Sequence, residues 1–442
     1  MNDNILKKLG ISELNDMQTA TADALLHSHK DIVVLSPTGT GKTLSYLLPL
    51  VERLNIHTDE LQALVVVPGR ELALQSCEVL KTMGSGLRTM SLYGGRPTMD
   101  EHREMRKIKP QIVFGTPGRL NDHIDKGNIL TDGVTWLIID EFDKCLEMGF
   151  HHEMSKLIDQ LGNLKRRILL SATEAEEIPH FVNLGRTTKV DFRTYEQVSD
   201  RVTIYEVKSL AKDKLDTLRA LLLQLGEESS IIFLNYRDSV ERTATYLRQY
   251  GFSVSMFHGG LEQKQREEAL YRFSNGSANI MVCTDLASRG LDIPDIQNII
   301  HYHLPESEDG YIHRVGRTAR WDKEGRAFFI LNATEQIPAY VNADIESYTL
   351  DAALYEADNH TVPQPRMATL YIGKGKRDKL SKADIVGFLC KKGGLKGGEI
   401  GKISVEERYT YVAVVRKKAR QVLKQVQGEK IKGIKTIVEE VR

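Results

Sequence analysis

Two short segments in the first third of the chain carry residue types that bind phosphate and a divalent cation. The first, SPTGTGKT at residues 36–43, follows an apolar run and ends in a lysine and a threonine. Its glycines let successive backbone N–H groups turn toward a phosphate, and a helix after it would add a positive dipole end. The pattern predicts a nucleotide site, with Lys42 on the β- and γ-phosphates and Thr43 on Mg²⁺. A glycine-rich turn that binds nothing is the alternative.

The second segment, LIIDEFDKCLEMGF at residues 137–150, is an apolar run that ends in acidic residues. It predicts a strand that delivers Asp140 to Mg²⁺ through a water, and Glu141 to the attacking water. The alternative is that Asp140 or Asp143 only caps the next helix. Because a phosphate loop lies upstream in the same α/β region, we favour catalysis by Lys42, Asp140 and Glu141.

Apolar runs rich in β-branched residues alternate with amphipathic segments along most of the chain. Between residues 31 and 190 the runs are DIVVLS, ALVVVP, QIVFG, WLIID and RILLSAT, and between 200 and 335 they are IIFLNY, SVSMFH, NIMVCT, NIIHYH and AFFIL. Near-continuous apolar strands of this length predict parallel sheets covered by helices on both faces. We therefore expect an α/β protein with two tandem parallel-sheet domains, a cleft between them, and ligands at the carboxyl ends of the strands.

The charge of the chain is unevenly distributed, although it sums to zero over 442 residues. Residues 368–442 hold 19 Lys and Arg against 8 Asp and Glu, an excess of 11. Such a basic tail predicts a domain that binds a polyanion, for which nucleic acid is the best candidate. No run approaches the ~18 apolar residues of a membrane span. Four widely spaced cysteines without a CxxC pair predict reduced thiols, so we expect a cytoplasmic protein with no membrane partner.

With these motifs in place, residues 1–335 resemble the DEAD-box RNA helicases, whose motifs occur here in the family's order. The resemblance implies two RecA-like domains, RNA-stimulated hydrolysis of ATP, and ATP and Mg²⁺ as ligands. It implies that Gln18 reads adenine and that Asp292 touches the ribose. The remaining nucleotide contacts that it implies are Ser36, Thr38, Gly39, Thr40, Gly41, Lys42 and Thr43, with Thr43 and Asp140 serving the metal.

The resemblance also implies residues for RNA binding and for coupling. In the first domain the RNA contacts would be Pro68, Arg70, Gly94, Gly95, Thr116, Pro117, Gly118 and Arg119. In the second domain they would be Gln263, Arg266, Thr284, Arg289 and Gly290. The residues that would couple nucleotide state to RNA are Asp143, Ser171, Thr173 and His313.

The segment HRVGRTAR at residues 313–320 spaces three arginines at i, i+3 and i+6, which on a helix would share neighbouring turns. A solvated basic helix face is the alternative. Planar guanidinium groups suit a γ-phosphate reached from a second domain. We therefore expect Arg317 and Arg320 to act as arginine fingers.

Four positions depart from the family pattern. Phe142 replaces an alanine, and we expect its side chain to pack away from ATP, so that Phe142→Ala costs little activity. Gly69 replaces a threonine, which would weaken one contact with the RNA backbone, and Ala319 replaces a glycine at little cost. The sequence has no counterpart of the aromatic residue upstream of Gln18, which would leave adenine selectivity mainly to Gln18.

The basic tail resembles the RNA-binding domain of DbpA-type DEAD-box proteins, which is RRM-like. The residues that carry this are GGLKGGEIGKISV, YVAVV and QGEKIKGIKT. We expect Lys430, Lys432 and Lys435 to contact phosphates. Tyr409 and Tyr411 alternate with valines on an expected strand, so they would either stack on unpaired bases or pack in the core.

We therefore expect a first, ATP-binding RecA-like domain at 1–195, a second at 201–355, a linker at 356–367 and an RRM-like domain at 368–442. The predicted function is ATP-dependent separation of short RNA duplexes by a monomer, which its tail targets to structured ribosomal RNA and to assembly intermediates of the large subunit. One alternative is an ATP-gated RNA clamp with little unwinding. Another is a translocating DNA helicase, against which Asp143 and Gln18 argue.

Overall fold

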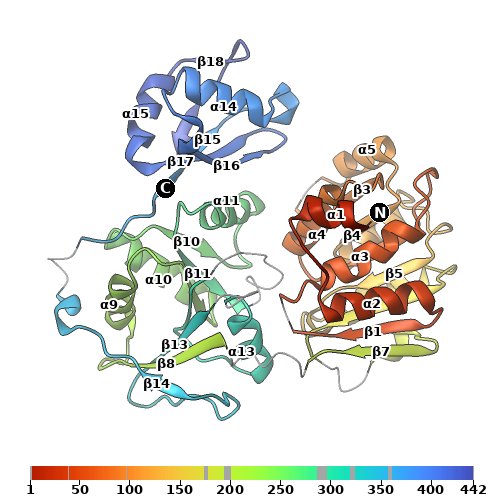
Figure 1. Ribbon diagram of the computed structural model, residues 1–442, viewed down its shortest axis with the longest axis horizontal. Coiled ribbons are helices and arrows are strands. Elements are labelled where there is room, and N and C mark those ends of the chain that lie inside the picture. Colours follow the sequence, from red (N-terminus) through yellow and green to blue (C-terminus); the bar gives the residue numbers. More distant parts are fainter. Residues whose placement is uncertain are drawn as a thin grey trace. The chain divides into compact units, whose positions relative to one another are not determined.

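The fold is described from a computed structural model of the chain (Figure 1). The structure describes residues 2–441 except 38, 96, 174–177, 194–200, 286–295, 319–323 and 357–360. The chain forms two compact units that divide near residue 200. No helix in the described part of the chain is long and apolar enough to cross a membrane.

The first unit is built on a seven-stranded parallel sheet with the strand order β3-β4-β2-β5-β6-β1-β7. Its strands are β1 (Asp31–Leu35), β2 (Ala63–Val66), β3 (Thr89–Leu92), β4 (Ile112–Gly115), β5 (Trp136–Ile139), β6 (Arg166–Ser171) and β7 (Thr187–Asp191). Since consecutive strands are joined by helical crossovers, the carboxyl ends of the strands meet at one edge, where ligands of such sheets bind.

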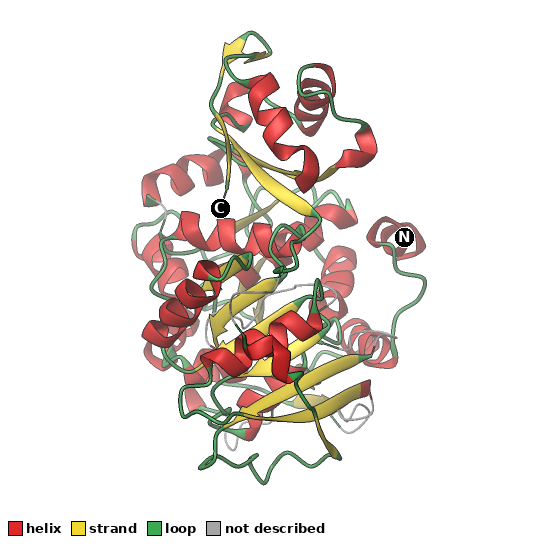
Figure 2. Ribbon diagram, turned by 90° about the vertical axis from the view of Figure 1, so that its left-hand side faces the viewer, coloured by secondary structure: helices red, strands yellow, loops and turns green. Residues whose placement is uncertain are grey.

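Helices cover both faces of this sheet. Figure 1 shows one of these helical layers, and Figure 2 distinguishes helices from strands by colour. The helices are α1 (Asn2–Leu9), α2 (Asp16–His27), α3 (Lys42–Arg53) and α4 (Arg70–Met83) on one face, and α5 (Thr98–Ile108), α6 (Pro117–Asp125), α7 (Phe142–Glu147) and α8 (His151–Asp159) on the other. Alternate residues of β2 enter the two cores: Val65 packs with the first group and Leu64 with the second. Burial on both faces explains why these strands are apolar throughout.

The second unit begins with another seven-stranded parallel sheet, in the order β10-β11-β9-β12-β13-β8-β14. Its strands are β8 (Val202–Lys208), β9 (Ser230–Leu234), β10 (Val254–Phe257), β11 (Ile280–Thr284), β12 (Asn298–His301), β13 (Gly325–Leu331) and β14 (Ile345–Ser347). Its longer helices are α9 (Leu215–Leu225), α10 (Arg237–Gln249), α11 (Gln263–Ser274) and α13 (Glu308–Val315). Helix α13 ends at Val315 and Arg317 lies in the turn that follows, so Arg314 and Arg317 do not share one helix.

The C-terminal segment of the second unit forms a four-stranded antiparallel sheet in the order β16-β17-β15-β20, as in an RRM-like domain. Its elements are β15 (Met367–Ile372), α14 (Lys382–Lys391), β16 (Ile400–Val405), β17 (Thr410–Val415), α15 (Arg416–Val426) and β20 (Val438–Glu440), with a hairpin of β18 (Lys430–Ile431) and β19 (Ile434–Lys435). Val412 and Val414 pack under the two helices. The structure thus confirms two RecA-like parallel-sheet domains followed by a small α/β domain.

The tyrosine face of this small sheet is covered. Tyr411 is only 2% exposed, and its ring stacks on Tyr271 of α11, with centroids 5.3 Å apart. Of the two alternatives for Tyr411, packing is therefore the one that the structure shows, although the ring packs on α11 and is not part of the core of the small domain.

Candidate nucleotide and RNA site

The loop 36–43 bridges the end of β1 and the start of α3, as its composition predicts. Gly39 and Gly41 have φ angles of 86° and 81°, which glycine adopts without the steric cost of a Cβ. The ammonium of Lys42 lies inside the loop, where it donates to the carbonyl oxygens of Ser36 at 2.6 Å and Pro37 at 2.9 Å. The hydroxyls of Ser36 and Thr40 lie 2.8 Å apart and close the loop from the other side. The lysine is thus held at the N-terminus of α3, where anions bind.

Gln18 lies against this loop. Its Nε2 donates to the carbonyl of Gly41 at 3.2 Å, and a Cβ built at Gly41 would lie 2.4 Å from that nitrogen. Gln18 also completes a reciprocal capping box with Asn15 at the start of α2. Asn15 in turn donates to the carbonyl of Thr40. The residue predicted to read adenine is therefore fixed next to the residues predicted to hold phosphate.

Asp140 directly follows β5 and is 2% exposed. Its carboxylate accepts from the backbone N–H of Glu141 at 3.0 Å and from the hydroxyl of Tyr46 at 3.3 Å. Burial raises the pKa of Asp140, while the positive charge of Lys42 lowers it. The Tyr46 hydroxyl also interacts with Thr43, so the two residues predicted to serve Mg²⁺ both lie near this tyrosine. Oxygen donors of this kind are what Mg²⁺ prefers.

The helix-cap alternative for this segment is not what the structure shows. The N-cap of α7 is Glu141, with a left-handed φ of 52°, and not Asp140 or Asp143. A non-glycine residue in that region costs ~1–2 kcal/mol, and such strain is concentrated at functional sites. Asp143 instead accepts from the N–H of Thr173 at 3.3 Å and from its hydroxyl at 3.1 Å. Ser171 donates to the carbonyl of Thr173 at 2.6 Å, so three residues predicted to couple ATP to RNA lie together.

Phe142 points into the core between β5 and α8 and is 2% exposed. This confirms the expectation that its side chain packs away from the phosphate loop. We expect Phe142→Ala to lower the free energy of unfolding by about 3–5 kcal/mol, because it leaves a cavity in a packed core. The rate of ATP hydrolysis per folded molecule should be unchanged. Urea unfolding and ATPase assays on the same samples, with Phe142→Leu as the milder control, would check this. A changed kcat with unchanged stability would contradict it.

The predicted RNA contacts of the first unit fall into two clusters. In the first, the guanidinium of Arg70 lies over the glycine pair, and a Cβ built at Gly95 would lie 2.9 Å from its Nη1. Gly95 also has a φ of 97°. A side chain at Gly95 would therefore displace Arg70, which explains why glycine is needed there. Pro68 directly precedes Gly69, the N-cap of the helix that begins with Arg70.

The second cluster is the TPGR segment, in which Thr116 is the N-cap of α6 and Pro117 its first residue. The side chain of Arg119 does not face solvent freely. Its Nε donates to Glu101 at 2.7 Å and its Nη1 to Thr98 at 3.0 Å. Glu101 is 1% exposed and also contacts His123 at 2.9 Å. The guanidinium of Arg119 thus joins the start of α6 to the start of α5, a role that the sequence does not indicate.

Arg314 has a structural role that the sequence did not reveal. It is 1% exposed and makes two bonds to Asp285, at 2.6 and 2.7 Å. It also donates to Asn235 and to the carbonyl of His303. Asp285 follows β11, Asn235 follows β9 and His303 follows β12. One buried guanidinium therefore joins three loops at the carboxyl edge of the second sheet.

Three other predicted residues of the second unit, Gln263, Arg266 and Thr284, also lie near the carboxyl ends of its strands. Gln263 begins α11, and its amide donates to Glu267 at 2.9 Å. The guanidinium of Arg266 lies over the ring of Phe257, 5.1 Å from its centroid. Thr284 is the last residue of β11. His313 and Arg317 are 5% and 4% exposed, respectively.

Some predicted residues lie outside the described part of the chain, namely Thr38, Arg289, Gly290, Asp292 and Arg320. The tail lysines predicted to contact phosphates, Lys430, Lys432 and Lys435, lie on the β18–β19 hairpin, and all three are exposed. Lys432 donates to Asp384 at 2.8 Å and to the carbonyl of Lys379, so part of its charge is used within the domain.

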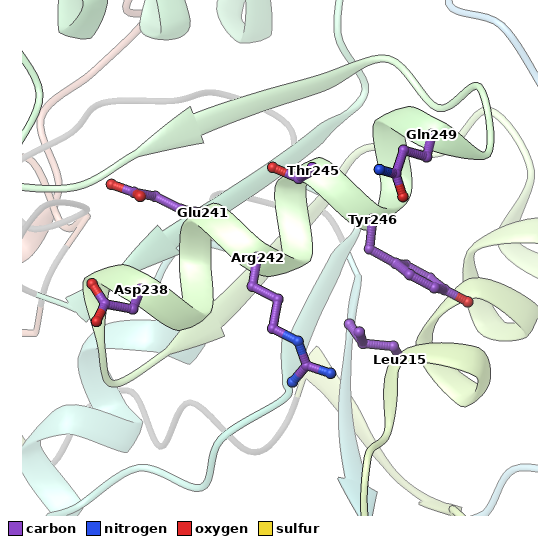
Figure 3. Close-up of a pocket in the computed structure, with 7 residues that line it drawn as sticks. All are labelled: Leu215, Asp238, Glu241, Arg242, Thr245, Tyr246 and Gln249. Carbon is purple, nitrogen blue, oxygen red and sulfur yellow. The ribbon is translucent and has the colours of Figure 1, made fainter.

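A cavity of about 470 Å³ lies elsewhere, along the outer side of α10 (Figure 3). Its lining residues are Leu215, Asp238, Glu241, Arg242, Thr245, Tyr246 and Gln249. The hydroxyl of Tyr246 donates to Asp216 at 2.5 Å, and Arg242 pairs with Asp213. None of the residues predicted from the motifs lines it, so we do not assign it to the nucleotide or RNA site.

Comparison with known proteins identifies the family to which each part of the chain is similar. The model for the DEAD/DEAH box helicases matches residues 15–181, that for the helicase conserved C-terminal domain matches 213–322, and that for the DbpA RNA binding domain matches 369–440. Two solved structures share the fold at 24% identity. S. cerevisiae Dbp5 bound to RNA and ADP BeF3 has a TM-score of 0.70 and covers 78% of this chain and 93% of its own. Mss116 bound to ssRNA and UDP-BeF has a TM-score of 0.69, with 81% and 80% covered.

The chain belongs to the DEAD-box family of ATP-dependent RNA helicases, and it is an RNA-dependent ATPase that carries a DbpA-type RNA-binding domain. Within that family it is similar along nearly its whole length to ATP-dependent RNA helicase DbpA. It is 34% identical over 437 residues to the protein of Escherichia coli (strain K12), covering 97% of this chain and 94% of the relative. It is 29% identical over 455 residues to that of Bacillus subtilis (strain 168), with 97% and 95% covered.

Proposed function

We propose that this protein uses ATP hydrolysis to separate short RNA duplexes locally and that its C-terminal domain targets it to structured ribosomal RNA during large-subunit assembly. The observation that carries the first part is the contact of Asp143 with Thr173. This contact joins the segment that holds the predicted catalytic acids to the predicted coupling segment. A change at the phosphate site would therefore reach the predicted coupling segment through directly bonded residues.

The chemistry of hydrolysis would be divided among residues of the first unit. Lys42 would bind the β- and γ-phosphates, and Glu141 would orient and polarise the attacking water. Thr43 and Asp140 would hold Mg²⁺, with Asp140 acting through a water. When bound, the metal would neutralise charge on the β- and γ-phosphates. The buried carboxylate of Asp140, which accepts from Tyr46, is positioned by that bond.

The second unit would supply the remaining charge. Arg317 and Arg320 would reach the γ-phosphate when ATP and RNA close the two units, and Asp292 would touch the ribose. The buried Arg314, near the end of α13, would anchor the helix to Asp285 and so fix the start of the turn that carries Arg317. Hydrolysis would then reopen the units, so ATP and RNA act by shifting an equilibrium between open and closed states.

The C-terminal domain would tether this core near a structured RNA and raise the local concentration of substrate. Because the tyrosine face is covered by α11, the exposed lysines of the β18–β19 hairpin are the better candidates for the tether. We propose the boundaries 1–195, 201–355, 356–367 and 368–442 for the domains and the linker. We also propose a cytoplasmic monomer. The four cysteines, all in the described part of the chain and none in a disulfide, are consistent with that compartment.

The charge of the hairpin gives a quantitative prediction. We expect the double variant Lys430→Ala/Lys435→Ala to reduce the slope of log affinity against log salt by about 2, because each lost phosphate contact removes ~0.9. Binding of an RNA hairpin would be measured at several salt concentrations. The matched control is Lys30→Ala/Lys165→Ala, which removes two exposed lysines before β1 and β6. An unchanged slope in the hairpin variant would show that the tether lies elsewhere.

The choice of nucleic acid separates this function from that of a translocating DNA helicase. We expect RNA to stimulate ATP hydrolysis strongly and single-stranded DNA of the same sequence to stimulate it weakly. Steady-state ATPase assays of the intact chain with the two oligonucleotides would check this. Equal stimulation by both would contradict the proposal.

A further inference from the structure

The contact between α11 and the C-terminal sheet is extensive and specific. The hydroxyl of Tyr271 donates to the carbonyl of Tyr411 at 3.2 Å and also to that of Lys402. Asn275, just after α11, donates to the hydroxyl of Thr369 at 2.9 Å. Aromatic stacking and buried hydrogen bonds together fix the orientation of two packed elements. The helix that starts with Gln263 is therefore held by the C-terminal domain along its second half.

A chain of hydrogen bonds extends this contact to the first turn of α11. The hydroxyl of Tyr409 donates to Oε2 of Glu267 at 2.7 Å. The other oxygen of that carboxylate, Oε1, accepts from Nε2 of Gln263 at 2.9 Å, four residues earlier on the same helix face. Lys264 lies over the rings of Tyr371 and Tyr409, 5.1 and 5.9 Å from their centroids. One carboxylate thus joins the C-terminal domain to the amide of Gln263.

This arrangement determines what Gln263 presents to a ligand. A glutamine amide has a donor end and an acceptor end, which can exchange by rotation. Since Glu267 accepts from the nitrogen, the oxygen of the amide must point the other way. Burial and the neighbouring Glu267 raise the pKa of the Tyr409 hydroxyl, so Tyr409 remains a donor at neutral pH. Both partners of Glu267 therefore donate, one to each carboxylate oxygen.

We propose that Glu267 is a positioning residue through which docking of the C-terminal domain orients Gln263 for RNA. The inference rests on the proposed function, which makes Gln263 an RNA contact of the helicase core. It gives the tyrosine face a role other than stacking bases. When the C-terminal domain is docked, Tyr409 holds Glu267, and Glu267 in turn holds the amide of Gln263.

A double-mutant cycle in the full chain tests the proposal. The variants are Tyr409→Phe, which removes only a hydroxyl, Gln263→Ala, and the two combined. The measured quantity is the KM for RNA in the ATPase reaction, with unstructured oligouridine as the RNA, so that the tether plays no part. We expect Tyr409→Phe to raise this KM about tenfold, the effect of one hydrogen bond to a charged group, without changing kcat.

The combined variant distinguishes a relay from a merely structural contact. If Tyr409 acts through Gln263, then Tyr409→Phe has no further effect once Gln263 is alanine. Tyr371→Phe removes a hydroxyl from the same face and should leave the KM unchanged. Equal effects of Tyr409→Phe in both backgrounds, or no effect in either, would overturn the proposal. Thermal unfolding of each variant verifies that the domain stays folded.

Failure of this inference differs from failure of the proposed function. If RNA does not stimulate ATP hydrolysis by the unmodified chain, the proposed function itself fails. If stimulation is normal and the two substitutions act independently, only the relay fails. Glu267→Gln, which has the same shape, should lower the affinity for RNA, because a glutamine amide accepts only at its oxygen and cannot accept from both partners with both of its ends.

Discussion

Lys42→Ala is expected to reduce RNA-stimulated ATP hydrolysis at least about 100-fold, because it removes a preorganised charge from the phosphates at which negative charge develops. Lys42 is 8% exposed, and its ammonium donates to the carbonyls of Ser36 and Pro37, which hold it in place. The effect should appear in kcat as well as in the KM for ATP. Initial rates at saturating RNA would measure it.

The control for this variant is Lys30→Ala, which removes an exposed lysine just before β1. That variant should keep the rate of the unmodified chain. Circular dichroism and thermal unfolding of both variants would show that the loss is chemical. Unchanged turnover in Lys42→Ala would remove the basis for placing ATP at this loop.

Arg317→Ala should reduce the same rate about 10³-fold or more, the usual contribution of an arginine finger. Arg317→Lys should restore little of it, because an ammonium lacks the planar fork that binds phosphate oxygens. Binding of ATP itself should change much less, since Lys42 and Gln18 lie in the other unit. The expected signature is therefore a low kcat with a nearly normal affinity for ATP.

A structural effect of Arg317 has to be distinguished from a catalytic one, because the residue is 4% exposed. Equilibrium unfolding of Arg317→Ala addresses this. Arg242→Ala is the matched control, since Arg242 is exposed on α10 and pairs with Asp213. A normal kcat in Arg317→Ala, or an equal loss in Arg242→Ala, would contradict the assignment.

Much of the fold follows from local sequence. The apolar runs around Val65 and Ile138 mark strands buried on both faces, and the loop before Lys42 could be recognised because backbone geometry and charge act over a few residues. The position of Phe142 between residues assigned to the site predicts that its side chain packs in the core. In each case the deciding interactions are close in the chain.

What the sequence did not reveal depends on contacts between distant segments. Arg314 has the same spacing pattern as Arg317, yet it is buried by Asp285, 29 residues away. The tyrosine face could not be assigned, because Tyr411 is covered by Tyr271, which precedes it by 140 residues. The bond from Tyr46 to Asp140 spans 94 residues. Polar partners of this kind are decided by the tertiary structure.

The central claim is that hydrolysis of ATP separates RNA strands. Displacement of a short labelled strand from a duplex next to an RNA hairpin tests it most directly, with the intact chain and with either ATP or no nucleotide. We expect rapid displacement with ATP, little without it, and little with Lys42→Ala. Tight RNA binding with ATP but no displacement beyond the spontaneous rate would contradict the account and identify an ATP-gated clamp instead.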